Sequence, residues 1–363
     1  MAEQLRRSVP GGVGTYAHGL LTGLAAAGAT DVTVHASKPA GKPAGKTAGR
    51  SGSGPDPLET YGFPVRTSPL PARGLTRAWD VGLVRAPAGF DVAHSVSQAF
   101  PSPRRAGAGP RVTVMVHDLS WRWVPEAFPP RGRRWHEATL ARAVARAAAL
   151  VTPSDRTAAE LRKEGANRVE VIEEGCDHLP PPDQDGAARL LEALGVDGPF
   201  LLSVGTQEPR KNLPRLMEAF GRARPRLPAP WPLVVVGPPG WGPALRTAPG
   251  VVPAGRVEAG VLAALYGASR CLVYVPLVEG FGLPPVEAMA QGTPVVASPM
   301  PSTGGAALEV DPLDAGAIAE AVVTAATDEE ARAGLTAAGR KRAAALTWEA
   351  CAWRHLDLWQ GLC

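Results

Sequence analysis

The chain has 363 residues, more than the about 250–300 at which one hydrophobic core stops growing, so the sequence predicts two domains and excludes a small binding module. Apolar residues make up 45% and charged residues 20%, and no apolar run approaches the about 18 residues that a membrane-spanning helix needs. The first ten residues, MAEQLRRSVP, lack the apolar stretch of a secretory signal, so we expect a cytoplasmic protein.

The formal net charge of +4 is unevenly distributed. Through Asp177 the chain carries 23 basic against 16 acidic residues, or +7, and after it 15 against 18, or −3. Arginine is abundant throughout, so basic residues alone are weak evidence for a function. Four cysteines in a chain of this length are too few and too widely spaced for a disulfide framework, so we expect free thiols.

Short apolar runs bounded by Gly, Pro or Asp alternate with longer Ala- and Leu-rich stretches of helical period. The predicted strands are 31–36, 90–96, 111–117, 149–153, 169–173, 199–205, 232–237, 271–277 and 293–298. The predicted helices are 14–27, 132–148, 155–165, 211–223, 259–268, 284–291 and 314–345. This alternation predicts an α/β protein with doubly wound parallel sheets, whose ligands bind at the carboxyl ends of the strands.

The domain boundary is predicted from proline and glycine. Residues 179–198 begin with three prolines and separate two series of strands and helices, so we expect an N-terminal domain at 1–178, a linker at 179–198 and a C-terminal domain at 199–345. Residues 37–57 are rich in Pro, Gly, Ser and Lys and contain a near-repeat of K-P-A-G. Such a composition cannot bury a core, so this segment is predicted to be a disordered insertion.

The most informative stretch is 276–298, PLVEGFGLPPVEAMAQGTPVVAS. A strand ends there, a Phe-Gly pair allows a tight turn, and proline suits the start of the next helix. Such a turn directs unpaired N–H groups at a ligand and favours a phosphate. Glu279 before the turn and Glu287 inside the helix can accept paired hydrogen bonds from vicinal hydroxyls of a sugar and a ribose. The alternative is that Glu287 complements the helix dipole and Glu279 is a solvated loop acid.

A second stretch, SVGTQEPRKNL at 203–213, ends a strand and opens a helix. Arg210 and Lys211 can neutralise a diphosphate without a metal, or they form an ordinary exposed helix start. A third stretch, PGGVGTY at 10–16, matches G-x-G-x-x-A. It could indicate dinucleotide binding, but no apolar strand precedes it, so that hypothesis lacks its structural context.

Two further segments carry candidate residues. His117 and Asp118 close the predicted strand RVTVMVH, where a cleft residue is expected, although fixing the imidazole or capping the next turn is an equally good role for Asp118. His94 follows another strand by the same logic. Residues 121–136 interleave tryptophan with arginine, which suits peripheral contact with an anionic membrane or simply an Arg-rich surface over packed aromatics. No nucleic-acid module accompanies them, so no nucleic-acid partner is expected.

The run E-G-F-G-L-P-x-x-E, followed by A-x-A-x-G-T-P-V-V-A-S, closely resembles the donor-site signature of the family 4 retaining glycosyltransferases of GT-B fold. The E-P-R-K-N run resembles the diphosphate site of that family, and V-H-D-L-S resembles the segment that borders its donor sugar. The resemblance covers nearly the whole chain. It implies two Rossmann-like doubly wound domains facing across a cleft, with the acceptor in the first and the nucleotide sugar in the second, and a closing helix at 346–363 that returns to the first domain.

The resemblance also implies roles for individual residues. Arg210, Lys211 and the N–H groups near Gly282 and Leu283 would hold the diphosphate, Glu287 the ribose and Glu279 the sugar hydroxyls. The implied catalytic residues are Glu279, His117 and Asp118. The implied donor-binding residues are Gly12, Gly14, Thr206, Arg210, Lys211, Val257, Glu279, Phe281, Gly282, Leu283 and Glu287. No metal and no cofactor are expected. Thr206 stands where many relatives carry arginine, and Arg210 is the residue that could compensate.

We therefore expect transfer of a hexose from a nucleotide sugar to a glycan, lipid-linked or small-molecule acceptor, as in cell-surface polysaccharide biosynthesis. A nucleotide-sugar epimerase and a non-catalytic nucleotide-sugar sensor are the alternatives. The G-T-x-E-P-R-K-N branch favours GDP-mannose as the donor, with a UDP-sugar as the other choice. The resemblance places the family's first strand before Met1. After Ser298 the family usually has a longer loop than this chain. Full activity of this chain is therefore an open question.

Overall fold

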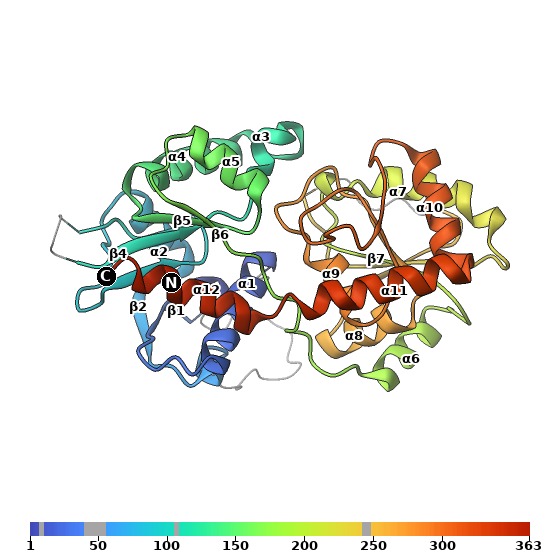
Figure 1. Ribbon diagram of the computed structural model, residues 1–363, viewed down its shortest axis with the longest axis horizontal. Helices are drawn as coiled ribbons and strands as arrows, with labels where there is room; N and C mark the ends of the chain where they lie inside the picture. Colours follow the sequence, from blue (N-terminus) through green and yellow to red (C-terminus); the bar gives the residue numbers. More distant parts are fainter. Residues whose placement is uncertain (7–10, 40–55, 105–108, 242–247) are drawn as a thin grey trace, which may run out of the picture. The chain divides into compact units, whose positions relative to one another are not determined.

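The computed structural model describes residues 1–6, 11–39, 56–104, 109–241 and 248–363. The predicted disordered insertion at 37–57 lies outside these ranges except at its two ends. The chain divides into two compact units, labelled by element in Figure 1. Unit 1 comprises Met1–His117, Arg134–His178 and Trp348–Cys363. Unit 2 comprises Asp118–Arg133 and Leu179–Thr347.

Unit 1 contains two parallel sheets. One is a pair of strands, β1 (Val34–Lys38) and β2 (Val65–Pro71). The other has the order β3-β4-β5-β6, formed by β3 (Val92–Ser95), β4 (Arg111–Met115), β5 (Ala149–Thr152) and β6 (Val169–Val171). The helices are η1 (Glu3–Arg6), α1 (Gly11–Ala26), η2 (Glu59–Tyr61), α2 (Ala72–Asp80), α4 (Pro130–Arg146, apart from its first turn), α5 (Asp155–Lys163) and α12 (Trp348–Gln360). The inner strand β5, which pairs with β4 and β6, is buried along its whole length.

The last helix of the chain, α12, packs against α1 within unit 1. The fully buried residue Trp348 lies against two glycines of α1 that are four residues apart. A Cβ at Gly19 would lie 2.0 Å from the Trp348 ring, and a Cβ at Gly23 would lie 2.0 Å from the Trp348 carbonyl oxygen. The indole Nε1 also donates to Nδ1 of His178 at 3.2 Å. Glycine at these positions therefore makes the space that the C-terminal segment occupies.

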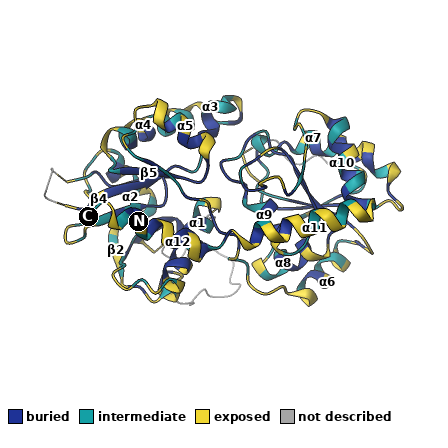
Figure 2. Ribbon diagram, in the orientation of Figure 1, coloured by how far each residue is buried: buried dark blue, intermediate teal, exposed yellow. Residues whose placement is uncertain are grey.

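Unit 2 is built on one six-stranded parallel sheet of order β12-β11-β10-β7-β8-β9. Its strands are β7 (Leu201–Val204), β8 (Leu233–Val236), β9 (Val251–Gly255), β10 (Cys271–Tyr274), β11 (Val295–Ala297) and β12 (Leu308–Glu309). Its helices are α3 (Ser120–Trp123), η3 (Pro125–Ala127), α6 (Gln184–Ala193), η4 (Pro209–Lys211), α7 (Leu213–Ala223), η5 (Arg224–Arg226), α8 (Ala259–Ala268), α9 (Leu283–Ala290), α10 (Ala315–Thr327) and α11 (Glu329–Ala344). The inner strands β7, β8, β10 and β11 are almost entirely buried, and Figure 2 shows exposed residues along helices such as α6 and α11.

The predicted α/β class with parallel sheets is confirmed, because every strand pair in the described residues is parallel. Three strands lie outside the predicted ranges: β2, β9 and β12. In β2 and β12 no residue is buried, and β9 buries only its first residue. All three strands lie at a sheet edge, so none has the continuous apolar run of a strand buried on both faces.

The segment 179–198, expected as a linker, differs from that expectation because it contains α6. Asp183 caps this helix by accepting a hydrogen bond from the Gly186 amide at 2.8 Å. The amide of Asp183 donates to the carbonyl of Gly260 at 2.9 Å, which ties the start of α6 to α8. Prolines 180–182 precede the helix and are compatible with an extended entry.

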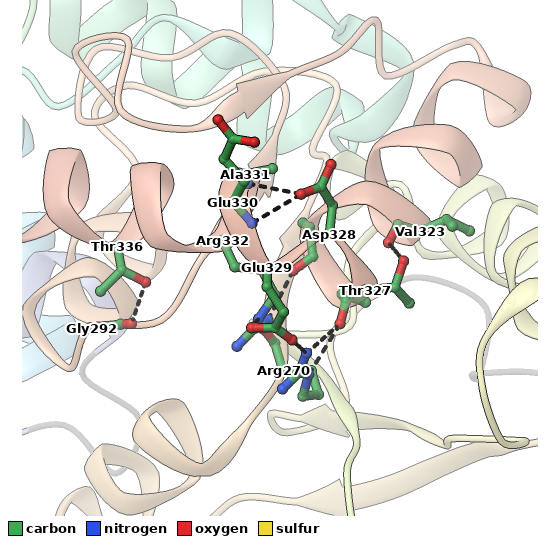
Figure 3. Close-up of polar contacts among 12 residues, drawn as sticks. Arg270, Gly292, Val323, Thr327, Asp328, Glu329, Glu330, Ala331, Arg332 and Thr336 are labelled. Carbon is green, nitrogen blue, oxygen red and sulfur yellow. Dashed lines mark hydrogen bonds and ion pairs between the residues drawn. The ribbon is translucent and has the colours of Figure 1, made fainter.

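The single helix predicted at 314–345 is two helices, α10 and α11, separated at Asp328 (Figure 3). The Asp328 carboxylate accepts hydrogen bonds from the amides of Glu330 and Ala331, each at 3.0 Å, and so caps the new helix. Arg270 donates to the carbonyl of Ala326 at the end of α10 and pairs with Glu329 at 2.7 Å. The prediction continued through this break because both helices are Ala-rich and have the same period, although Asp328 followed by Glu329 and Glu330 is a helix-start signal.

Candidate functional site

The ends of two neighbouring strands of unit 2 bring the predicted site residues together. Strands β7 and β10 are adjacent and parallel, so their carboxyl ends lie at the same edge of the sheet. Arg210 and Lys211 lie in η4, shortly after β7, and Glu279 lies in the loop after β10. Tyr274, the last residue of β10, completes the group. We call Arg210, Lys211, Tyr274 and Glu279 the strand-end cluster.

The polar atoms of this cluster are within hydrogen-bond distance of one another. The Lys211 Nζ donates to Oε1 of Glu279 at 2.6 Å and to the hydroxyl of Tyr274 at 2.6 Å. The Tyr274 hydroxyl donates to Oε1 of Glu279 at 2.8 Å. The guanidinium of Arg210 lies 2.8 Å from the same carboxylate oxygen and pairs with Glu208, also at 2.8 Å. Two cations and two carboxylates thus neutralise one another at this edge of the sheet.

Burial makes these charges interact strongly. The side chains of Arg210, Lys211 and Glu279 are only 14%, 13% and 10% exposed. Burial alone would raise the pKa of Glu279, but the positive charges of Arg210 and Lys211 and their hydrogen bonds outweigh it, and the pKa falls to about 2. Burial lowers the pKa of Lys211, and the charge of Glu279 opposes that change. The carboxylate is therefore ionised throughout the physiological pH range, and the solvated loop acid of the sequence alternative is not what the structure contains.

The turn that carries Arg210 and Lys211 is held by Asn212. This residue has a left-handed backbone with φ of 58°, which asparagine tolerates better than most residues. Its side-chain amide donates to the carbonyls of Val275 at 3.0 Å and Pro312 at 2.7 Å. The Arg210 carbonyl accepts from the amide of Leu277 at 2.9 Å. These bonds attach the turn to the loop after β10 and keep both cations beside Glu279.

The start of α9 provides backbone donors near the same edge. Gly282 has φ of 97°, a conformation that favours glycine, and a Cβ there would lie 2.4 Å from the Met300 sulfur, so a side chain would also have to displace Met300. The next residue, Leu283, begins the helix and is followed by Pro284 and Pro285. Because proline has no N–H, the amides that this helix start can offer to an anion are chiefly those of Gly282 and Leu283.

Glu287 lies in α9 and is buried, with 7% of its surface exposed. The hydroxyl of Tyr266, in α8, donates to its Oε2 at 2.7 Å. Burial raises the pKa of Tyr266 well above its usual value, and the neighbouring Glu287 charge adds to the effect. The Tyr266 phenol is thus a neutral donor that orients the carboxylate.

The other predicted donor-side residues lie around the cluster. Phe281 is buried and its carbonyl accepts from the Ser302 amide at 3.2 Å. Thr206 follows Gly205, whose carbonyl oxygen would lie 2.0 Å from a Cβ at Gly237. The turn after β7 therefore lies directly against the turn after β8. Val257 lies between β9 and α8, and since β8 and β9 follow β7 in the sheet, it is further from the cluster along the strand ends.

Gly12 and Gly14 lie in unit 1, in the first turn of α1, where Gly12 is exposed and Gly14 is buried. His117, also in unit 1, has partners on both ring nitrogens. Its Nδ1 lies 3.2 Å from Oε1 of Glu174 and its Nε2 lies 2.9 Å from the carbonyl of Val96. Glu174 is buried beside a predicted site residue, so it is a functional candidate that sequence patterns missed.

Asp118 and His94 have structural partners. The Asp118 carboxylate accepts from the amide of Ser120 at 2.9 Å, which is the turn-capping arrangement weighed above. His94 lies within an interior network, bonded to the hydroxyls of Tyr16 at 3.1 Å and Thr113 at 2.9 Å. The network continues from Tyr16 to Nε2 of the fully buried His355 at 2.8 Å.

The aromatic and basic residues of 121–136 are not exposed to the same degree. Trp121 is 4% exposed and Trp123 and Trp135 are half-buried, whereas Arg131 and Arg134 are exposed. This division favours packed aromatics beneath surface arginines over an exposed aromatic belt. Within the described residues, no helix has both the length and the apolar character to cross a membrane.

With this geometry established, comparison with known proteins is informative. Residues 10–178 match the family model Glycosyltransferase Family 4, and residues 198–328 match Glycosyl transferases group 1. The O-antigen chain mannosyltransferase B of Escherichia coli is 30% identical over 269 residues, which cover 69% of this chain and 70% of that protein. The chain belongs to glycosyltransferase family 4. It is therefore a glycosyltransferase, as the sequence motifs predict.

Solved structures of similar fold extend along nearly the whole of this glycosyltransferase. Sucrose-phosphate synthase from Thermosynechococcus elongatus has a TM-score of 0.69 and 23% identity and covers 97% of this chain and 94% of its own. HepE from Anabaena, solved in complex with UDP-glucose, has a TM-score of 0.68 and 18% identity; the match covers 98% of this chain and 97% of HepE. At these identities the likeness establishes the fold alone. The predicted GT-B class, with two Rossmann-like α/β units, is confirmed.

Proposed function

We propose that this glycosyltransferase moves a hexose, with retention of configuration and without a metal, from a nucleoside-diphosphate sugar to a hydroxyl acceptor. The observation that carries the proposal is the strand-end cluster, in which Arg210 and Lys211 converge on Glu279. Guanidinium and ammonium together supply the positive charge that a departing diphosphate requires. The amides of Gly282 and Leu283 add uncharged donors at the start of a helix.

The two carboxylates would accept hydrogen bonds from hydroxyl groups of the nucleotide sugar. Glu279 receives three donors in this structure, and hydroxyls of the transferred sugar would replace some of them. Glu287, oriented by Tyr266, would accept hydrogen bonds from the ribose. His117 would orient the sugar or the acceptor, with Asp118 beside it in sequence. Gly12, Gly14, Thr206, Phe281 and Val257 stay predictions as donor contacts.

The bond changes need no protein nucleophile. The bond between the anomeric carbon and the β-phosphate oxygen breaks, and the acceptor oxygen bonds to the same face of that carbon. The acceptor proton passes to the departing phosphate oxygen. Arg210 and Lys211 would hold the diphosphate of the bound donor and stabilise the further charge that develops on it in the transition state.

For the donor we propose GDP-mannose. The G-T-x-E-P-R-K-N run supports this choice, and the relative from Escherichia coli is named a mannosyltransferase. A UDP-sugar is the alternative, since HepE was solved with UDP-glucose. The acceptor is proposed to be a glycan or lipid-linked glycan. Peripheral membrane contact through 121–136 would depend on the exposed Arg131 and Arg134, and replacing both by Glu should weaken sedimentation with phosphatidylglycerol vesicles.

The test uses purified protein, GDP-mannose and UDP-glucose, with and without glycan and lipid-linked acceptors, in the presence of EDTA. Transfer that needs an acceptor and survives EDTA supports the proposal. Isomerisation of the donor without acceptor would indicate an epimerase, and binding without turnover a sensor. Glu279→Ala and Lys211→Ala should each abolish transfer, whereas Lys163→Ala should not, because the Lys163 side chain is 71% exposed and pairs with Glu160 on its own helix. Full activity of both cluster variants would refute the site.

A further inference from the structure

The hydroxyl of Tyr274 stands between the two charged groups to which the proposed function assigns the diphosphate and the sugar. It accepts a hydrogen bond from the Lys211 ammonium and donates one to the Glu279 carboxylate. A phenol has one proton to donate and can accept in addition, so both of its bonds are satisfied by these two partners. Neither role needs a sugar or a phosphate to be present.

The position of the Tyr274 ring is more restricted than the positions of the Lys211 and Glu279 side chains. It is the last residue of the buried strand β10 and is 3% exposed, so the sheet and the core hold its ring. Lys211 has a flexible four-carbon stem, and Glu279 lies in a loop. The phenol oxygen is therefore the rigid reference point of the cluster.

Three donors, from Lys211, Arg210 and Tyr274, contact the same carboxylate oxygen of Glu279, Oε1. Sugar hydroxyls bound by Glu279 would compete with these donors. The ammonium would then lose its acceptor on Glu279 while it must stay charged in a largely buried position. Within the described part of the chain its other hydrogen bond goes to Tyr274, which leaves its third N–H for a phosphate oxygen.

We propose that Tyr274 is a positioning residue, which holds the Lys211 ammonium in place and in its charged form while Glu279 exchanges protein donors for sugar hydroxyls. This inference rests on the proposed function of the cluster. Removing the phenol oxygen leaves a buried ammonium with one acceptor fewer, which favours the neutral amine. The charged groups that face Lys211, namely Arg210, Glu208 and Glu279, are unchanged by that substitution.

The experiment compares full-length wild type with Tyr274→Phe and, as a matched control, Tyr266→Phe. The titration of Lys211 is followed by competitive acetylation with acetic anhydride and mass spectrometry between pH 7 and 11, with the exposed Lys163 as internal reference. Tyr274→Phe should lower the Lys211 midpoint by about one pH unit, a tenfold change in the ratio of charged to neutral amine. Tyr266→Phe, whose hydroxyl contacts Glu287 instead, should leave it unchanged.

Binding of GDP and of UDP, measured by calorimetry over the same pH range, provides the functional readout. In Tyr274→Phe the alkaline loss of binding should begin about one pH unit lower, in parallel with the labelling. If wild type binds neither nucleotide, the proposed function fails, but the labelling still decides the role of Tyr274. An identical Lys211 midpoint in wild type and Tyr274→Phe would overturn the inference. Should the Phe variant not fold, Tyr274→Met fills the core without a hydroxyl and answers the same question.

Discussion

Replacing Glu279 by glutamine should destabilise unit 2 strongly, because the amide keeps the shape of the side chain but removes the charge that compensates Arg210 and Lys211. The pKa of Glu279 falls from 4.5 to about 2 in the folded protein. At about 1.4 kcal/mol per pH unit, this depression corresponds to roughly 3 kcal/mol of stabilisation. Breaking a buried pair from one side typically costs about 3–5 kcal/mol, so the two values agree.

The pH dependence of this contribution has a definite sign. A carboxylate whose pKa is depressed on folding stabilises the protein above its unfolded pKa and loses that contribution as the pH falls towards its folded pKa. The difference between wild type and Glu279→Gln should therefore be constant between pH 5 and 8. It should shrink below the usual carboxyl pKa of 4.5 and vanish near pH 2.

The assay is urea unfolding followed by hydrogen exchange of peptides from β10 and α9, which reports unit 2 separately from unit 1. Glu320→Gln is the matched control, since Glu320 pairs with Arg226 on the surface and is 67% exposed, and it should behave like wild type. Adding Lys211→Met to Glu279→Gln should restore part of the loss, because one uncompensated cation is removed. Unchanged unfolding of Glu279→Gln, or additive losses in the double variant, would refute the reasoning.

Two further predictions concern unit 1. Gly23→Ala should lower the free energy of unfolding by about 1–3 kcal/mol, because its Cβ would lie 2.0 Å from the Trp348 carbonyl oxygen. As a control, Gly334→Ala, in open space on α11, should raise it by up to about 1 kcal/mol. Thermal unfolding measures both variants, and equal effects would contradict the packing. His355 is buried, which lowers its pKa to about 4, so the unfolded chain binds its proton first and stability falls as the pH drops below 6.5. From this residue alone we expect a loss of about 2 kcal/mol at pH 5 relative to pH 7.5, measured by urea unfolding. His355→Gln should remove that share of the pH dependence, whereas His94 and His35, whose pKa values burial also lowers, continue to contribute; a flat wild-type profile would contradict the reasoning.

Local patterns predict the parts of this protein that short stretches of chain control. Strands buried on both faces have continuous apolar runs, and helix α8 has the bounds that its composition predicts. The glycine at 282 and the prolines after it predict a turn and a helix start, because few backbone conformations are open to these residue types. The edge strands β2, β9 and β12 lack such a signal, and there prediction from sequence fails. The break at Asp328 does have one, an Asp followed by two Glu, which the Ala-rich helical period on both sides outweighed in the prediction.

The candidate site divides in the same way. Glu279, Arg210 and Lys211 could be named from motifs, but Tyr274 and Tyr266 could not, since a tyrosine at the end of a buried strand or in a helix is typical of a core. What makes them polar partners is their hydroxyl position relative to residues far away in the chain. Tyr274 meets Lys211 across 63 positions, and Tyr266 meets Glu287 across 21.

The sequence by itself therefore determined the α/β class, the family and the chemical types of the donor-site residues, because these follow from periodicity, backbone restriction and contiguous motifs. Only the tertiary structure decided that β10 lies beside β7, which places Lys211 against Glu279, and that α12 packs on the glycines of α1. Both depend on contacts between distant segments. Burial of those contacts then sets the protonation of Glu279 and His355, which no local pattern encodes.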